Sequence, residues 1–336
     1  MGIIVLNRRV VGFLLVLFIF LVFPFVVTSK YLIQLINTAL VFLIIVMGMN
    51  YVIGFSGQIS LAATGFWGIG AYTSALATTS LGLSFWIALP IASIFATVFG
   101  FIIGFPTLKL KHFYLGIATV GFGEIVALIL LNWTSLTNGA DGLPGIPKPT
   151  IGGYVFETDF QFYYILLGAV LVLLFVCVRI KNSRFGRGLL AICEDELAAE
   201  VVGIPTHWYK MLAFALSAFY GGAAGSLYAH LIGFISPDLF VFRQSIIFLC
   251  MFMIGGSGYV TGPVIGAFLL TLLPEWMRFL KEYYMAVYGL AVVVLAIGMP
   301  TGIMGLIERY LPRLFGWLEP HAEVPAARLK RGTEKP

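Results

Sequence analysis

The most regular feature of this sequence is a series of apolar runs separated by short polar stretches. Several runs reach about 18 residues, the length that an α-helix needs to cross a ~30 Å hydrocarbon core. The pattern predicts an all-α polytopic membrane protein with about ten transmembrane helices. Glycines interrupt the third, eighth and ninth runs, where broken or re-entrant segments are an alternative. The predicted spans cover residues 10–27, 31–52, 66–81, 84–105, 113–133, 162–180, 210–232, 243–256, 259–274 and 283–299.

Basic residues indicate which loops face the cytoplasm. With the N-terminus inside, all of the 20 Lys and Arg residues fall in inner loops or the tail except Lys30, Lys148, Arg243, Arg278 and Lys281. Cytoplasmic loops carry an excess of Lys and Arg, so the pattern predicts that both termini are cytoplasmic. We expect a transmembrane domain over residues 1–309 and a polar cytoplasmic tail over 310–336.

Composition supports the membrane assignment and excludes other classes. Hydrophobic residues make up 60% of the chain and charged residues only 10%, whereas about a quarter of the residues in soluble proteins are charged. The net charge of +5 does not indicate nucleic-acid binding, because the basic residues follow the two sides of the membrane. The three cysteines are isolated and show no metal-ligand spacing, so neither a metal nor a bound cofactor is expected.

The loop over residues 179–210 is charged yet has a helical pattern of its own. It predicts one helix of roughly 15 residues, which Gly203 and Pro205 would end because glycine favours a helix cap and proline cannot continue the helix. Arg187 belongs to the basic entry of this loop, as expected on the cytoplasmic side. The apolar stripe of the helix comprises Leu190, Cys193, Leu197, Val201 and Ile204, and the opposite side carries Glu194, Asp195, Glu196 and Glu200.

Two surfaces could receive this amphipathic helix. Helices that rest on lipid headgroups have the same pattern. The polar side is acidic, however, and anionic lipid repels acidic side chains. A protein partner with an apolar groove is therefore favoured.

A glycine-rich polar segment over residues 54–72 follows the second span. Small residues there allow close helix packing, but irregular backbone at membrane depth is also typical of a polar path. Both interpretations stay open. The polar candidates for a path in this segment are Ser56, Gln58, Ser60 and Tyr72, and a second glycine-interrupted stretch covers residues 254–268.

Glu124 lies near the middle of the fifth predicted span. A carboxylate there costs roughly 2.5–3.5 kcal/mol unless it has a partner. Glu124 either faces a translocation path or makes an interhelical hydrogen bond, in which case it could be protonated. No intramembrane Lys or Arg is an obvious counter-ion.

Two further features limit what the chain does. The longest outward loop, residues 134–161, contains glycines and prolines that predict ordered turns, which would act either as a connector or as a docking surface. The sequence contains no G-x-x-x-x-G-K-[ST], H-E-x-x-H or G-x-S-x-G motif, so we expect a chain that is not an enzyme and does not itself hydrolyse ATP.

Several stretches together resemble the permease subunits of branched-chain amino acid ABC importers of the LivM-like type, and the urea permeases of the same superfamily. The resemblance extends from about residue 50 to 309. The 179–210 loop is similar to the family's cytoplasmic coupling segment over residues 186–204. The other shared motifs are GFSGQISL at 54–61, FWGIGAY at 66–72, GFGEI at 121–125, NGADGLPGIP at 138–147 and GPVIGA at 262–267.

This resemblance implies one subunit of a larger importer in the bacterial inner membrane. It implies a sister permease, two cytoplasmic ATPase subunits that use ATP, and a periplasmic binding protein that delivers leucine, isoleucine or valine. The coupling helix would sit in a groove of an ATPase and switch the membrane domain between two states. The residues implied in coupling are Arg187, Leu190, Glu194, Glu196, Leu197, Glu200, Val201 and Gly203, and those implied in the substrate path are Ser56, Gln58, Ser60, Tyr72 and Glu124.

Four residues depart from the family pattern, and Ala62, Ala63 and Tyr259 lie in possible path segments, where a departure affects the substrate more than the fold. Cys193 stands where arginine is usual, Ala62 and Ala63 replace a glycine and a polar residue, and Tyr259 stands where threonine is common. Urea or short amides are therefore an alternative substrate class. An ion-coupled secondary transporter with Glu124 as its proton site is the alternative of another class, and a membrane-embedded enzyme is the least favoured because intramembrane His, Asp and Glu are almost absent.

Overall fold

The structure is a computed structural model, and it describes residues 20–25, 29–107, 112–277, 289–290, 293 and 301–310. The predicted spans over 10–27 and 283–299 lie mostly outside the described residues, and the predicted tail over 310–336 lies outside them except for Tyr310. The described part of the chain is a bundle of helices with two small two-stranded sheets at one end.

Six helices in the described part are long and apolar enough to cross a membrane. Each corresponds to a predicted span, although the total of about ten stays a prediction. Helices α3, α11 and α12, at the glycine-interrupted runs that the pattern marks as ambiguous, are shorter, and α11 reaches the length of a span only together with η3 before it. The six are α2 (Lys30–Met49) with the π-helical η1 (Asn50–Phe55), α4 (Phe85–Thr107), α5 (His112–Asn132), α7 (Asp159–Lys181), α10 (Thr206–Ile232) and η3 (Pro237–Leu239) with α11 (Phe242–Gly255); the other helices of the bundle are α3 (Ala63–Thr79), α12 (Gly262–Trp276) and α14 (Gly302–Tyr310).

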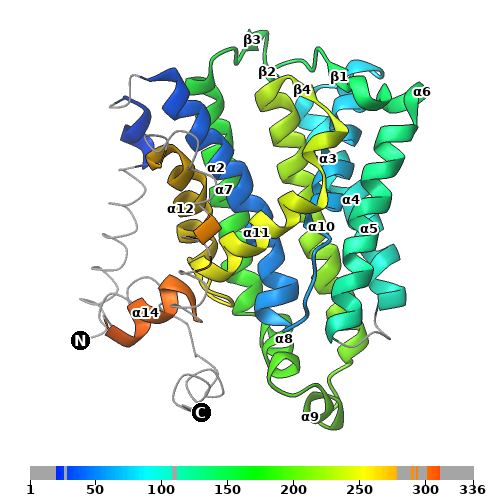
Figure 1. Cartoon of the computed structure of the whole chain (residues 1–336), viewed down its shortest axis with the longest axis vertical. Helices are drawn as coiled ribbons and strands as arrows, with labels where there is room; N and C mark the ends of the chain where they lie inside the picture. Colours follow the sequence, from blue (N-terminus) through cyan, green and yellow to red (C-terminus); the bar gives the residue numbers. More distant parts are fainter. Residues whose placement is uncertain are drawn as a thin grey trace.

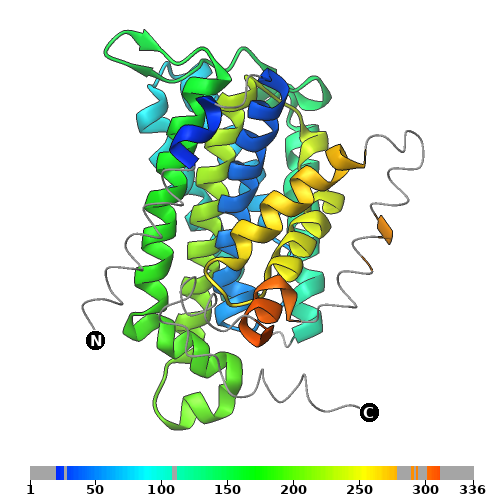
Figure 2. The same cartoon turned by 90° about the vertical axis from the view of Figure 1, so that its left-hand side faces the viewer.

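Helix α10 forms the centre of the bundle and packs against α4, α3 and α2 (Figures 1 and 2). Small residues allow this close approach because they let helix backbones come together. A Cβ atom added at Gly70 of α3 would lie 2.4 Å from Cα of Gly222 in α10, and one at Gly225 would lie 2.2 Å from the carbonyl oxygen of Trp67. The α3–α10 contact therefore depends on glycine.

Ordered turns cover the upper end of the bundle in Figure 1. The loop after α5 contains α6 (Thr134–Thr137), η2 (Gly139–Asp141), β1 (Leu143–Pro144), β2 (Thr150–Ile151) and β3 (Tyr154–Val155). Strand β2 pairs with β3, and β1 pairs antiparallel with β4 (Phe234–Ile235), which follows α10 and precedes η3 (Pro237–Leu239). We call this the hairpin end.

Side chains attach the loop to the helices beneath it. The indole of Trp86 donates to the carbonyl of Thr150 at 2.8 Å, and the ammonium of Lys148 donates to the carbonyl of Leu231 at 2.6 Å. Burial lowers the pKa of Lys148, and the carboxylate of Asp159 partly offsets this shift. The loop is therefore a cap held in a defined position.

Candidate coupling surface and translocation segments

Two short helices, α8 (Arg184–Glu194) and α9 (Glu196–Val201), lie at the end of the bundle opposite the hairpin end. Helix α8 is anchored to its neighbours. A Cβ atom added at Gly188 would lie 2.2 Å from the ring of Tyr209 in α10, and one at Gly186 would lie 2.2 Å from the carbonyl oxygen of Lys181 in α7. Leu189 and Ile192 are buried. The position of α8 is thus determined by α7 and α10.

The helix is interrupted at Asp195, which separates α8 from α9, so the prediction of one continuous helix is wrong. Asp195 has extended backbone angles of φ −155° and ψ 111°. Its carboxylate accepts the backbone N–H of Ala198 at 3.0 Å and so caps the start of α9. Aspartate favours this cap position because its side chain replaces a missing helical hydrogen bond. The predicted stop is confirmed: α9 ends at Val201, and Gly203 follows with a φ of +87°.

Helix α9 presents an apolar face to the outside. Leu197 is 75% exposed, Val201 86% and Val202 75%. Leu190, Cys193 and Ile204 are partly buried, so the predicted apolar stripe is divided: one part packs on the bundle and the other part projects from it. Two apolar side chains this exposed on a six-residue helix, with a third on the residue that follows it, are a surface without a partner in the described chain. We call Leu197, Val201 and Val202 the α9 face.

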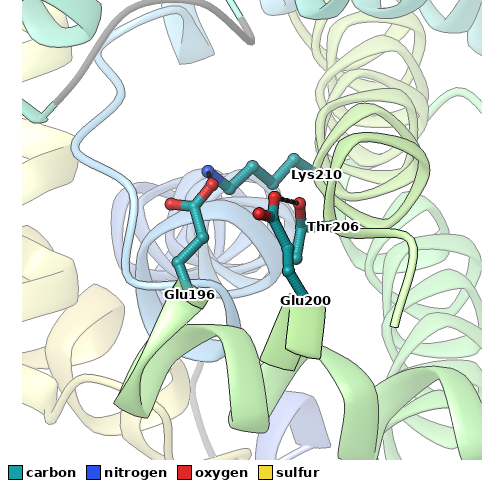
Figure 3. A network of polar contacts seen from close by, with 4 residues as sticks. All are labelled: Glu196, Glu200, Thr206 and Lys210. Carbon is teal, nitrogen blue, oxygen red and sulfur yellow. Dashed lines mark hydrogen bonds and ion pairs between the residues drawn. The ribbon is translucent and has the colours of Figure 1, made fainter. Parts of the chain in front are cut away.

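The acidic residues of α9 turn back toward the bundle (Figure 3). The carboxylate of Glu196 forms an ion pair with the ammonium of Lys210, and Glu200 accepts a hydrogen bond of 2.6 Å from the hydroxyl of Thr206. Both partners belong to the first turns of α10. Glu196 and Glu200, which the sequence places on the acidic side of the helix, are therefore paired within the chain, and their interactions hold α9 at the base of α10.

Two other predicted coupling residues lie at the edges of this surface. Glu194 is exposed, and the described residues provide no hydrogen bond or ion pair for it. The guanidinium of Arg187 donates to the carbonyl of Asn182 at 3.0 Å, which lies in the turn before α8. Glu194 is thus the acidic side chain next to the α9 face that stays available to a partner.

Helix α8 also contacts the glycine-rich segment that follows η1. A Cβ atom added at Gly57 would lie 3.0 Å from Sγ of Cys193, and the φ of Gly57 is +71°. Cys193, the residue that departs from the family pattern, therefore packs directly on this segment. A movement of α8 would be transmitted to it through that contact.

Residues 56–62 form a break between η1 and α3, at the place where the sequence predicts a broken helix. The hydroxyl of Ser56 donates to the carbonyl of Val52 at 2.7 Å, and Ser60 accepts the N–H of Ala62 at 3.4 Å. Buried Oε1 of Gln58 has no hydrogen-bond partner among the described residues. The break leaves polar groups inside the bundle, which is unusual unless water or a ligand reaches them.

The second half of the same segment, in α3, packs closely. A Cβ atom added at Gly65 would lie 2.7 Å from the ring of Phe122. Tyr72 is buried with its ring 5.9 Å from that of Phe240, and its hydroxyl has no partner within the described part of the chain. The first half of this segment thus has irregular backbone, and its second half has small residues that allow close packing.

Glu124 has a partner that the sequence did not reveal. Its Oε1 accepts the backbone N–H of Phe242, the first residue of α11, at 3.0 Å. An unpaired N–H at the start of a helix favours a negative group. Glu124 therefore acts as an interhelical cap, which agrees with the hydrogen-bond interpretation and leaves a role in the path untested.

Asn50 joins the two glycine-rich stretches, and sequence reasoning missed it. This buried side chain donates to the carbonyl of Tyr259 at 2.7 Å and accepts the N–H of Gly258 at 3.1 Å. The hydroxyl of Tyr259 in turn donates to Glu308 of α14. An asparagine inside an apolar run was the available signal, because a buried amide in a membrane span requires partners.

Comparisons with known proteins agree with this architecture. The sequence profile described as "Branched-chain amino acid transport system / permease component" matches residues 31–296. The chain is 37% identical to the high-affinity branched-chain amino acid transport system permease protein LivM of Escherichia coli K12, over 86% of this chain and 73% of that protein. It is 26% identical to LivH, a permease protein of the same named system, over 79% and 91% respectively.

A more distant relative has a different cargo in its name. The galactose/methyl galactoside import permease protein MglC of E. coli K12 is 26% identical over 44% of this chain and 46% of that protein. No solved structure matches the chain. The profile match over most of the chain and the identity to LivM are sufficient to assign the family: the chain belongs to the permease components of branched-chain amino acid transport systems.

Proposed function

We propose that this chain is a permease subunit of an ABC importer that carries leucine, isoleucine and valine across the bacterial inner membrane. The identity to LivM over most of both chains is the observation that carries this proposal. A sister permease, two cytoplasmic ATPases and a periplasmic binding protein complete the importer. This chain binds no cofactor, and ATP is used by the partner ATPases.

The α9 face is the contact to an ATPase. Its three exposed apolar side chains fit an apolar groove, and Glu194 beside them is free to meet a basic residue. Placing this end of the bundle in the cytoplasm also agrees with the basic residues Arg179, Lys181, Arg184 and Arg187 around α8.

In this proposal, the contacts that α9 and α8 make with the bundle couple the ATPases to the translocation path. When the ATPases close on ATP, they pull α9, and the ion pair of Glu196 with Lys210 transmits the pull to α10. Packing of Cys193 on Gly57 transmits the same movement to residues 56–62. Because α10 is the centre of the bundle, a shift there changes the packing of α2, α3 and α4 and alternates access to the path.

Transport by the assembled complex tests this function. The chain would be co-purified with its sister permease and ATPases, reconstituted in liposomes and supplied with binding protein and ATP. We expect uptake of radiolabelled leucine and valine that requires ATP. If the liposomes take up urea or acetamide but do not take up leucine, the alternative substrate class is the correct one.

The same liposomes test the alternative of an ion-coupled transporter. Uptake that persists without ATPases and collapses with the proton gradient would identify a secondary transporter with Glu124 as its proton site. The hydrogen bond from the N–H of Phe242 gives Glu124 a structural partner as a cap of α11. We expect Glu124→Gln to retain uptake, since the amide oxygen still accepts this hydrogen bond.

A further inference from the structure

Two lateral faces of the bundle expose different groups at membrane depth. Every side chain that α4 exposes between Trp86 and Phe105 is apolar, which suits contact with lipid. The second face consists of α5, residues 56–62 and α11, and we call it the α5–α11 face. It exposes a carboxylate and irregular backbone among its apolar side chains.

The carboxylate is that of Glu124, which is partly exposed. At 1.5 Å per residue it lies about 15 Å from Tyr114 and about 12 Å from Asn132 along α5, and these residues bound the apolar span. Glu124 is therefore near the centre of the membrane, where a carboxylate that faces hydrocarbon is costly, and the N–H of Phe242 satisfies only its Oε1. Lipid does not suit this position.

The irregular backbone is that of residues 56–62, which run between α11 and α5 (Figure 1). Thr119 of α5 accepts the N–H of Leu61 at 3.0 Å, and Ser245 of α11 donates to its carbonyl at 3.0 Å. Ile59 is 45% exposed, and its N–H donates to no acceptor among the described residues. A Cβ atom added at Gly116 would lie 3.4 Å from Ile59, and Gly116 is about 3 Å along α5 from Tyr114, so this exposed backbone lies toward the α8 end of the apolar span, where protein or water covers it.

The rest of the α5–α11 face suits contact with another helix. Gly121 lies on the same side of α5 as Glu124, and a Cβ atom added there would meet nothing within 4 Å, so the backbone is open to close approach. On α11, Phe242, Ile246 and Met253 are exposed at helical spacing. Apolar side chains thus flank the polar groups on both sides.

We propose that the α5–α11 face is covered by a second permease subunit of the LivH type, and that Glu124 and residues 56–62 line the path between the two permeases. This assignment rests on the proposed function. The inferred occupant is a membrane protein, because hydrocarbon does not suit the carboxylate of Glu124 and bulk water does not suit the apolar side chains that flank it. A LivH-type chain is the specific choice because LivM and LivH, both relatives of this chain, are named as permeases of one transport system.

Site-specific photo-crosslinking in the assembled importer tests the assignment. The photoreactive residue p-benzoylphenylalanine would replace Ile117 of α5 or Ile246 of α11, with Ile94 of α4 and Val172 of α7 as matched exposed controls. After illumination of membranes that contain all subunits, adducts are identified by mass spectrometry. We expect an adduct with the second permease from positions 117 and 246, at least fivefold more abundant than from the controls.

Three results would overturn the assignment: adducts with the second permease mainly from Ile94 or Val172, adducts only with lipid from positions 117 and 246, or adducts with another copy of this chain. Leucine uptake by the unsubstituted complex in the same membranes separates the two proposals. If uptake is absent, the proposed function fails; if uptake is present but the crosslinks come from α4 or α7, only the assignment of the face fails.

A substitution provides an independent measurement. Gly121→Leu would place a bulky side chain on the α5–α11 face, and Gly168→Leu would do the same on α7, where a Cβ atom also meets nothing within 4 Å. We expect the second permease to co-purify several-fold less with Gly121→Leu and normally with Gly168→Leu. Equal co-purification with both variants would contradict the assignment.

Discussion

Helices α8 and α9 are adjacent in the chain and differ in how they are held. Helix α8 is fixed by close backbone contacts at Gly186 and Gly188, and its apolar residues Leu189 and Ile192 are buried. Helix α9 makes its intramolecular contacts mainly through polar side chains and exposes its apolar ones. The difference is what the proposed coupling role requires, with α9 as the contact to the ATPase and α8 as its connection to the bundle.

The largest expected effect comes from changing the α9 face. Leu197→Asp combined with Val201→Asp should reduce ATP-dependent leucine uptake more than tenfold, because charged groups do not enter an apolar groove without a partner. Both side chains are exposed, so thermal stability should change little. Uptake assays and thermal melting of the detergent-purified complex measure the two quantities.

Ile151→Asp is the matched control for this double change, because Ile151 is an exposed apolar residue at the hairpin end. It should leave coupling to the ATPases intact. Normal ATP-driven uptake by the α9 double variant would show that the α9 face has no role in coupling.

The second-largest effect is expected from a substitution at the site where α8 is anchored to α10. Gly188→Ala would place a Cβ atom 2.2 Å from the ring of Tyr209 and should destabilise the protein by about 1–3 kcal/mol. Gly168→Ala makes the same change in α7 where the added atom meets nothing, and it should be neutral or stabilising. Melting temperatures compare the pair, and equal values would mean that α8 is not tightly anchored.

The third prediction concerns the ion pair between α9 and α10. Glu196→Ala leaves the buried ammonium of Lys210 without its carboxylate, which should cost about 1–2 kcal/mol and loosen the start of α10. Glu194→Ala removes an exposed acid of the same loop and should change stability by less than about 0.5 kcal/mol. Denaturation experiments measure the free energy of unfolding of both variants. If the ion pair were absent, the two variants would be equally stable.

The smallest effect is expected at the break between the helices. Asp195→Ala removes the cap of α9 and should cost about 1 kcal/mol of local stability. Asp195→Asn keeps a capping oxygen and should retain most of it. Hydrogen exchange of residues 196–201 measures this directly; equally slow exchange in both variants would argue against the cap.

Much of the fold was predictable because membrane spans follow from hydrophobicity alone. The six apolar spans lie where the sequence predicts them, and α3, α11 and α12 are shorter helices at the runs that glycines such as Gly65, Gly255 and Gly262 interrupt. Backbone hydrogen bonds must be satisfied within each helix in lipid, so a long apolar run has few alternatives. The spans outside the described residues stay predictions.

The site was less predictable because its details depend on contacts between distant residues. The apolar spacing of Leu190, Leu197 and Val201 suggested one helix, but capping by Asp195 breaks it. Glu124 finds the N–H of Phe242, which is 118 residues away. A single sequence shows that Glu124 requires a partner but does not show which group provides it.

Photo-crosslinking from the α9 face is the most direct test of the coupling role. With p-benzoylphenylalanine in place of Val201 in the fully assembled importer, illumination should produce an adduct with an ATPase subunit, and the amount should change when ATP is added. Adducts only with phospholipid, or only with the periplasmic binding protein, would contradict the account.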